Sequence, residues 1–70
     1  MSNHHKISNS TSIEHIDYHE PYTLEIKFIS GTTYHYSNCP KDYYEQLKTA
    51  VSAGKYFQAN ILNKFAHKKV

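Results

Sequence analysis

Residues 52–57, Ser-Ala-Gly-Lys-Tyr-Phe, combine the groups that a phosphate-bearing ligand requires. They precede a predicted helix, whose first turn would offer free N–H groups and a dipole that favours an anion. Ser52 adds a hydroxyl, Lys55 a counter-charge and Tyr56 a ring that could stack on a base. Gly54 would let the backbone approach a ligand closely, or would serve as a left-handed cap of the preceding helix. The alternative interpretation of this segment is an ordinary helix cap.

A second cluster of hydroxyl groups, Ser10, Thr11 and Ser12, directly precedes the first predicted strand. These side chains could hydrogen-bond the phosphate or ribose oxygens of a ligand, or could instead satisfy the backbone of a strand-entry turn. The sequence leaves both interpretations open. If the chain self-associates, this cluster in one copy could complete a pocket with residues 52–56 of another copy.

Self-association is expected for a chain of only 70 residues. A domain of this size buries roughly 60% of the surface of its unfolded chain, so its stability is marginal. Ile29 and Leu62 are apolar and fall outside the predicted core. We therefore predict a homo-oligomer, in which such side chains would be covered.

The six histidines and the single cysteine raise the questions of metal binding and catalysis. His15 and His19 share a strand face by their spacing, and His35 could lie opposite, but no cysteine or carboxylate cluster completes a tetrahedral set. We expect scattered surface histidines and no metal. A cysteine–histidine nucleophile would require Cys39, for which the sequence locates neither a base nor oxyanion donors. We therefore predict that the protein is not an enzyme and uses no cofactor.

Three strands are predicted to position these residues. Residues 22–29 alternate apolar and polar side chains, a period of two that is typical of a strand. Its apolar face consists of Tyr22, Leu24, Ile26 and Phe28. Residues 13–18 and 32–36 are strand-like on either side, joined to it by a turn at residues 19–21 and by a tight reversal at Gly31, which can take positive φ. The three strands form an antiparallel meander.

Two helices are predicted after the strands. Pro40 suits the first turn of a helix, and residues 41–51 carry apolar side chains at helical spacing. A second helix is indicated by apolar residues that recur at intervals of four, namely Phe57, Ile61 and Phe65. The predicted fold is therefore α+β, a three-stranded antiparallel meander followed by two helices packed on one sheet face.

Tyr34 and Tyr36 share one face of the third predicted strand. They could be stacking platforms for bases, as on the sheets of RNA-binding domains. Their period matches that of the apolar face of residues 22–29, however, and this match favours burial under the helices.

The chain is predicted to be one domain, residues 7–66, with a flexible arm at residues 1–6 and a frayed basic tail at residues 67–70. The net charge of +2 divides into −2 over residues 1–40 and +4 over residues 41–70. A basic C-terminal part suggests an anionic partner. Every positive side chain is a lysine, which lacks the planar fork by which arginine reads guanines, so sequence-directed binding to duplex DNA is not expected.

No segment predicts secretion or a membrane span. Residues 1–12 are polar, and a single cysteine cannot form an internal disulfide. No apolar run approaches the roughly 18 residues of a membrane helix. We expect an intracellular, cytoplasmic protein.

Several motifs occur in the order typical of one known family. They are Ser10-Thr11-Ser12-Ile13, Leu24-x-Ile26-x-Phe28, Tyr34-x-Tyr36 and Ser52-x-Gly54-x-Tyr56-Phe57. With these motifs, residues 7–65 resemble the KTSC domain, which occurs at the C-terminus of some lysyl-tRNA synthetases and as small free-standing bacterial and phage proteins. The resemblance implies a binding domain in a bacterium or a phage-infected cell, and the synthetase association suggests RNA as its ligand.

Three residues depart from the pattern of that family. Asp17 stands where the family usually has Gly, Cys39 replaces an aliphatic residue, and Gln58 replaces Asn. Gln58 keeps the amide group and is counted with the candidate ligand-binding residues. The complete predicted set is Ser10, Thr11, Ser12, Ser52, Gly54, Lys55, Tyr56 and Gln58.

Two binding functions of different class follow from these features. The first is non-catalytic binding of a small phosphate-bearing nucleotide, such as a cyclic dinucleotide or an ADP-ribose-type signal, which a stand-alone phage-type protein would sequester. The alternative is an RNA-binding accessory module, whose affinity would fall steeply with salt. Six lysines in residues 41–70 are a weak track for a long polyanion but sufficient for one or two phosphates, which favours the nucleotide. We expect Lys55→Ala and Tyr56→Ala each to abolish binding.

Overall fold

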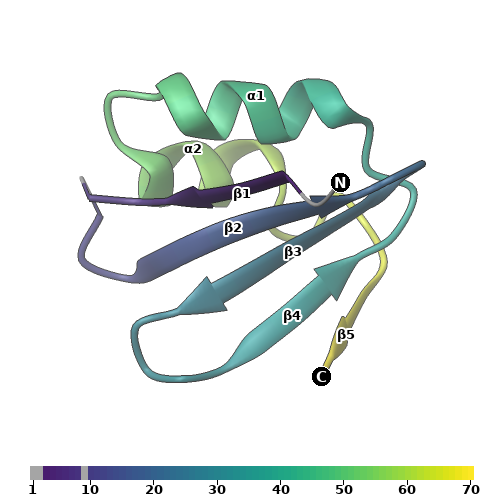
Figure 1. The fold of residues 1–70 in the computed structure, drawn as a ribbon, viewed down its shortest axis with the longest axis horizontal. Coiled ribbons are helices and arrows are strands. Elements are labelled where there is room, and N and C mark those ends of the chain that lie inside the picture. Colours follow the sequence, from purple (N-terminus) through teal and green to yellow (C-terminus); the bar gives the residue numbers. More distant parts are fainter. Residues whose placement is uncertain (1–2, 9) are drawn as a thin grey trace.

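A five-stranded sheet and two helices make up the computed structural model, which describes residues 3–8 and 10–70. The strands are β1 (Asn3–Lys6), β2 (Ile13–His19), β3 (Thr23–Phe28), β4 (Thr33–Tyr36) and β5 (His67–Lys69). Helices α1 (Lys41–Thr49) and α2 (Ala53–Asn60) lie between β4 and β5 in the chain. Neighbouring strands pair antiparallel in the order β1-β2-β3-β4-β5. Both helices lie on one side of the sheet (Figure 1).

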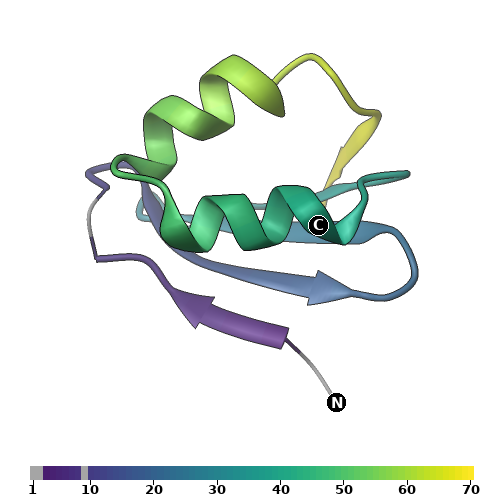
Figure 2. The ribbon, with the colours of Figure 1, turned by 90° about the horizontal axis from the view of Figure 1, so that it is seen from above.

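The predicted α+β class, the antiparallel sheet and the two helices are confirmed, but the predicted number of strands is wrong. The sheet has five strands, because β1 and β5 occupy residues that were predicted to be a flexible arm and a frayed tail. The two added strands form opposite edges of the sheet (Figure 2). Their sequences, Asn-His-His-Lys and His-Lys-Lys, have no apolar alternation. Backbone pairing to β2 and β4 makes them strands, and such pairing leaves no hydrophobic signal in the sequence.

The bounds of the remaining elements differ from the predicted ones by a few residues. Helix α1 ends at Thr49 and α2 ends at Asn60, so Phe65 lies beyond the second helix. The tight reversal between β3 and β4 contains Gly31 with φ of +99°, as predicted. Gly54 has no positive φ and lies inside the first turn of α2, so its predicted role as a left-handed cap is wrong.

The hydrophobic core fills the space between the sheet and the helices. The inward side chains of β3, and those of β2 from Ile16 onward, alternate with polar ones, as a strand period of two requires. A register shift between Ile13 and His15 turns Ile13 inward as well. Tyr36 is only 2% exposed, which confirms burial rather than a role as a stacking platform, and Tyr34 packs against the core. Tyr22, predicted on the apolar face, lies just before β3 and is 57% exposed. The best-buried residues include Ile13, Ile16, Tyr18, Leu24, Ile26, Leu47 and Ile61.

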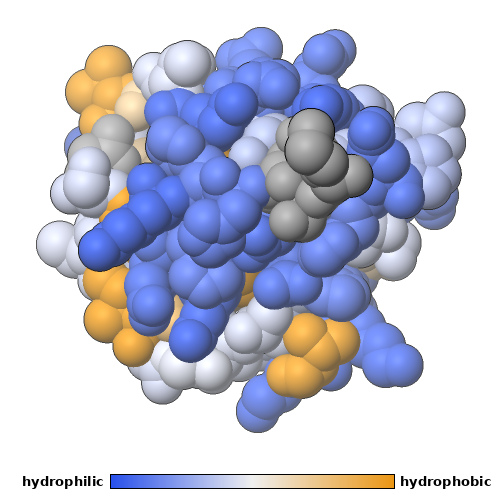
Figure 3. Space-filling model, in the orientation of Figure 1, coloured by the Kyte–Doolittle hydropathy of each residue, from blue (hydrophilic) through white to orange (hydrophobic). Residues whose placement is uncertain are grey.

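The opposite face of the sheet is polar and carries neither helix (Figure 1). Along β2 and β3 its side chains are those that alternate with the core residues, and they include Asp17 and Glu25. The view in Figure 3 shows a surface dominated by hydrophilic residues, with smaller apolar areas near its margins.

Candidate functional site

The start of α2 and the loop before β2 together form a hollow of about 390 Å³, called here the hydroxyl pocket. It is lined by Ser10, Thr11, Ser12, Ser52, Gly54, Lys55 and Gln58. Seven of the eight residues predicted as ligand-binding therefore lie around one hollow. The sequence suggested that residues 10–12 and 52–56 meet between two copies of the chain. The fold instead unites most of these residues within one copy.

Gly54 is the point at which α2 approaches the loop most closely. A Cβ atom on Gly54 would lie 3.2 Å from the Ser10 hydroxyl oxygen and 3.3 Å from that of Ser12. Such distances are shorter than ordinary van der Waals contact. The absence of a side chain at this position therefore lets the two serine hydroxyls lie against the first turn of the helix.

The hydroxyl groups of the pocket are already partly hydrogen-bonded. Ser10 Oγ accepts the backbone N–H groups of Ser12 and Ile13, each at 3.1 Å, so this segment is a strand-entry turn. Ser52 is the N-cap of α2, and its Oγ accepts the N–H of Lys55 at 3.4 Å. The structural interpretations of both segments are therefore confirmed. They do not exclude a ligand, because each hydroxyl oxygen can form further hydrogen bonds.

The first turn of α2 gives the hydroxyl pocket a positive polarity. Tyr56 N–H donates to the Ser52 carbonyl at 3.0 Å. Gly54, in the same turn, is half-buried and lines the pocket, whereas Ala53 is fully buried. Lys55 is exposed and is the one charged side chain among the described residues that line the pocket. The pocket therefore offers donors and a cation, without a carboxylate that would repel an anion.

Two comparisons with known proteins identify the family to which these motifs belong. The model of the KTSC domain family matches residues 9–65. The chain belongs to the KTSC domain family. Its structure is similar to the crystal structure of a KTSC domain protein from Yersinia pestis, with a TM-score of 0.87 and 32% sequence identity. That similarity covers 100% of this chain and 99% of the other. No curated protein matches this KTSC chain.

Tyr56 of the KTSC domain does not line the hydroxyl pocket, contrary to the sequence-based expectation. It lies in a neighbouring hollow between the two helices, with Asp42, Tyr43, Gln46 and Asn60. Its ring is half-buried and packs against the core. On a helix, successive residues point in directions about 100° apart, so Tyr56 and Lys55 face different hollows. The carboxylate of Asp42 makes the second hollow unsuited to phosphate.

Cys39 is buried in the core of the KTSC domain. Burial raises the pKa of its thiol to about 11. A nucleophilic cysteine requires a lowered pKa, so that the thiolate is populated near neutral pH. Cys39 is therefore a packing residue of the core.

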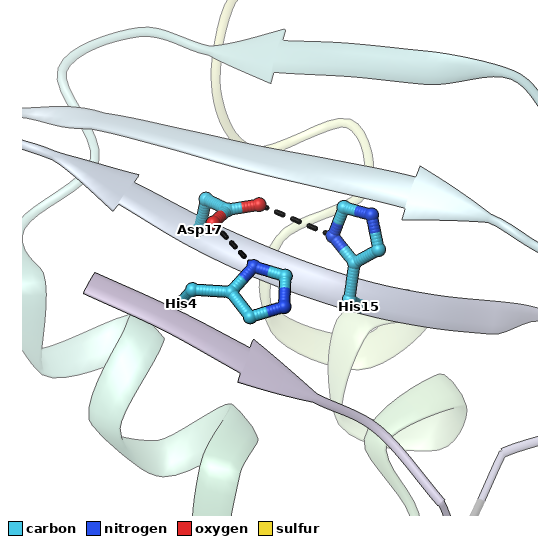
Figure 4. A group of neighbouring side chains, drawn as sticks. All are labelled: His4, His15 and Asp17. Atoms are coloured by element: carbon cyan, nitrogen blue, oxygen red, sulfur yellow. Dashed lines mark hydrogen bonds and ion pairs between the residues drawn. The ribbon is translucent and has the colours of Figure 1, made fainter. Parts of the chain in front are cut away.

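The histidines of the KTSC domain are not scattered, contrary to prediction. His4 and His15 both contact the carboxylate of Asp17, through Nδ1 atoms at 2.7 and 3.1 Å (Figure 4). His19 and His35 both contact one oxygen of the Glu25 carboxylate, through Nε2 atoms at 2.9 and 2.8 Å. The alternation of residues 15, 17 and 19 was visible in the sequence. The missing information was the strand register, which brings β1 and β4 to these residues.

Two further expectations concern membranes and assembly. Among the described residues, neither helix has the length and apolar character needed to cross a membrane. Ile29 is 55% exposed and Leu62 is 37% exposed, so both apolar side chains lie at the surface of the monomer. The homo-oligomer stays a prediction, which size-exclusion chromatography with light scattering would test.

Proposed function

We propose that this KTSC domain is a non-catalytic binding domain for a small phosphate-bearing nucleotide, such as a cyclic dinucleotide or an ADP-ribose-type signal. One observation carries the proposal. Two segments more than 35 residues apart, one with three hydroxyl groups and one with a hydroxyl, a lysine and an amide, meet at the start of a helix to form one pocket. The described lining of that pocket contains a lysine and no acidic residue.

A phosphate group would bind at the first turn of α2. The half-buried Gly54 lies in that turn and lines the pocket, and the helix dipole favours negative charge there. Lys55 is exposed and free to swing over the bound phosphate. Ser52 caps the helix and so holds this turn in place.

The other lining residues suit the sugar or base of a nucleotide. Thr11 and Ser12 are exposed hydroxyls on the loop side, and Gln58 presents an exposed amide one turn beyond Gly54. Hydroxyl and amide groups can both donate and accept hydrogen bonds, as recognition of ribose and base edges requires. The volume of about 390 Å³ lies near the lower end of the range of small-molecule sites. A small ligand is therefore favoured over a polymer.

The distribution of the lysines gives RNA less support. Lys48 on α1 is engaged by Glu45 at 2.9 Å. Lys68 lies on β5 opposite His35, on the face of the sheet without helices. Lys55 lies at the start of α2, on the other side of the sheet. A backbone track for RNA needs successive phosphate contacts along one surface, and these three residues do not share one.

The proposed role is to hold the nucleotide rather than to convert it. The described lining of the hydroxyl pocket contains no histidine, cysteine or carboxylate that could act as a general acid or base. A protein of this kind acts by binding its ligand and so lowering the concentration of free ligand. For a nucleotide signal, this action is sequestration.

Isothermal titration calorimetry and native mass spectrometry would test the proposal. The full chain is titrated with inorganic phosphate, mononucleotides, cyclic dinucleotides, ADP-ribose and a short single-stranded RNA. We expect at least one nucleotide to bind without being converted, and Lys55→Ala to weaken that binding. Tight binding of RNA with every small nucleotide silent would contradict the proposal. Nucleotide binding that Lys55→Ala leaves unchanged would place the site elsewhere.

A further inference from the structure

The face of the sheet opposite the helices gathers four imidazoles around two carboxylates. The strand register aligns His4 with Asp17, Asp17 with Glu25, and Glu25 with His35, so one row crosses four strands. His15 and His19 lie two residues on either side of Asp17 and therefore share its face of β2. None of these residues belongs to the hydroxyl pocket.

The six side chains form two groups of the same composition. In the first, His4 Nδ1 lies 2.7 Å from one oxygen of Asp17, and His15 Nδ1 lies 3.1 Å from the other (Figure 4). The second has the two Nε2 atoms of His19 and His35 at 2.9 and 2.8 Å from the same oxygen of Glu25. Within each group, one candidate ligand atom per residue lies within 4.8 Å of the others.

The electrostatic environment favours a cation between these side chains. Asp17 and Glu25 are directly opposite on adjacent strands, an arrangement in which two like charges repel. Lys27 and Lys68 occupy neighbouring positions of the register. Among the described residues, however, no lysine forms an ion pair with either carboxylate. The imidazoles are the immediate partners of both charges, and a neutral imidazole has a lone pair that a metal ion can use.

The donor set determines the class of ion. Two imidazole nitrogens and one carboxylate oxygen suit zinc and the neighbouring divalent transition metals, whereas calcium and magnesium prefer oxygen ligands. Bonds of about 2.0–2.2 Å in a tetrahedron would place ligand atoms about 3.3–3.6 Å apart. The nitrogen–oxygen separations of 2.7–3.1 Å are shorter than this spacing, so the side chains would have to move apart slightly to hold an ion. His4 and His35 are 53% and 36% exposed, so small rotations can open each group to the required spacing.

We propose that this face binds two divalent transition-metal ions of the zinc class. One ion is held by His4, His15 and Asp17, and the other by His19, Glu25 and His35. Three protein ligands leave a fourth position open at each ion, which is typical of exchangeable rather than closed structural sites. The proposal is independent of the nucleotide pocket, which lies elsewhere on the chain.

Calorimetric titration of the metal-free full chain with zinc chloride tests this proposal, with native mass spectrometry to count the ions. We expect two zinc ions per chain, and magnesium at the same concentration should displace neither. His4→Gln and His35→Gln each remove one exposed ligand, so each variant should lose one of the two ions. His5→Gln is the matched control, because His5 lies on β1 but outside both groups, and it should still bind two ions.

Circular dichroism of each variant shows whether the fold is retained, which we expect because the side chains of His4 and His35 are exposed. Fewer than two zinc ions on the unaltered chain would overturn the proposal. So would two ions that remain bound, with unchanged affinity, in folded His4→Gln and His35→Gln variants.

Discussion

Gly54 and Ser10 approach so closely that a methyl group on Gly54 would lie 3.2 Å from the Ser10 hydroxyl oxygen. This contact joins the first turn of α2 to the loop before β2, and it sets the width of the hydroxyl pocket. We expect Gly54→Ala to push the loop away from the helix and to weaken nucleotide binding by at least about tenfold, or about 1.4 kcal/mol. The free energy of unfolding should change by less than about 1 kcal/mol, because alanine favours the helix while crowding opposes it.

Gly31→Ala is the matched control for that substitution. Gly31 has φ of +99° and no atom within 4 Å of the position of an added Cβ. Alanine at this position should lower the free energy of unfolding by roughly 1–2 kcal/mol through backbone strain alone. Binding should be unchanged, since Gly31 lies in the β3–β4 turn. Calorimetry and urea unfolding of both variants measure the two effects, and a loss of binding in Gly31→Ala would contradict the proposed cause.

Lys55 should contribute to binding but not to stability. Its side chain is exposed and lines the hydroxyl pocket. We expect Lys55→Ala to remove most of the affinity for a nucleotide while the free energy of unfolding stays within about 0.5 kcal/mol. Lys64→Ala removes a similarly exposed charge outside the pocket and should bind normally. Equal losses of affinity in the two variants would indicate a general charge effect instead of a site.

Ser52 has two roles that substitution can separate. Its hydroxyl caps α2, so Ser52→Ala should cost about 0.5–1 kcal/mol of stability, at the low end because the capping contact is 3.4 Å long. Ser52→Asp preserves a capping oxygen and should keep that stability. It also places a negative charge in the pocket, and phosphate binding should therefore be lost. Thermal unfolding and calorimetry distinguish these outcomes, and retained binding in Ser52→Asp would argue against a phosphate at this helix start.

The side chain of Tyr18 is buried in the core, and its hydroxyl contacts two loops. Its hydroxyl lies 2.6 Å from the Pro21 carbonyl oxygen and 2.8 Å from that of Cys39. Tyr18→Phe leaves these carbonyls without this donor and should cost about 1–2 kcal/mol in urea unfolding. Tyr22→Phe removes the hydroxyl of an exposed tyrosine and should change stability by less than about 0.5 kcal/mol. If Tyr22→Phe lowered the free energy of unfolding as much as Tyr18→Phe, the loss in Tyr18→Phe could not be explained by burial of its hydroxyl.

Glu25 should make the stability of the fold sensitive to acid. Burial raises the pKa of its carboxyl, but hydrogen bonds from His19 and His35 outweigh burial and hold that pKa below the ordinary value of 4.5. Because the folded-state pKa is the lower one, ionised Glu25 stabilises the fold above about pH 4.5, and this contribution disappears as the pH falls through the folded-state pKa. Urea unfolding between pH 3 and 6, with a chelator present, measures this contribution to the free energy of unfolding. Glu25→Gln should show a shallower loss of stability in this range, and an unchanged slope would contradict the assignment.

Elements whose signal is local could be predicted from the amino-acid sequence. The alternation of residues 22–29 identified the central strand, and the helical spacing after Pro40 identified α1. The hydroxyls, the glycine and the lysine of residues 10–12 and 52–58 were recognisable as ligand-binding types because their chemistry does not depend on their neighbours in space. The family motifs were recognisable for the same reason.

Which of these residues meet depends on the three-dimensional fold. The edge strands β1 and β5 consist of polar residues, and their conformation depends on hydrogen bonds to distant strands. Helix geometry turns Tyr56 away from Lys55, but the hollow that Tyr56 faces exists only because α1 packs beside α2. The strand register alone places His4 beside Asp17 and His35 beside Glu25. Periodicity specifies the face of an element, whereas pairing and packing specify its neighbours, and a binding site is made of neighbours.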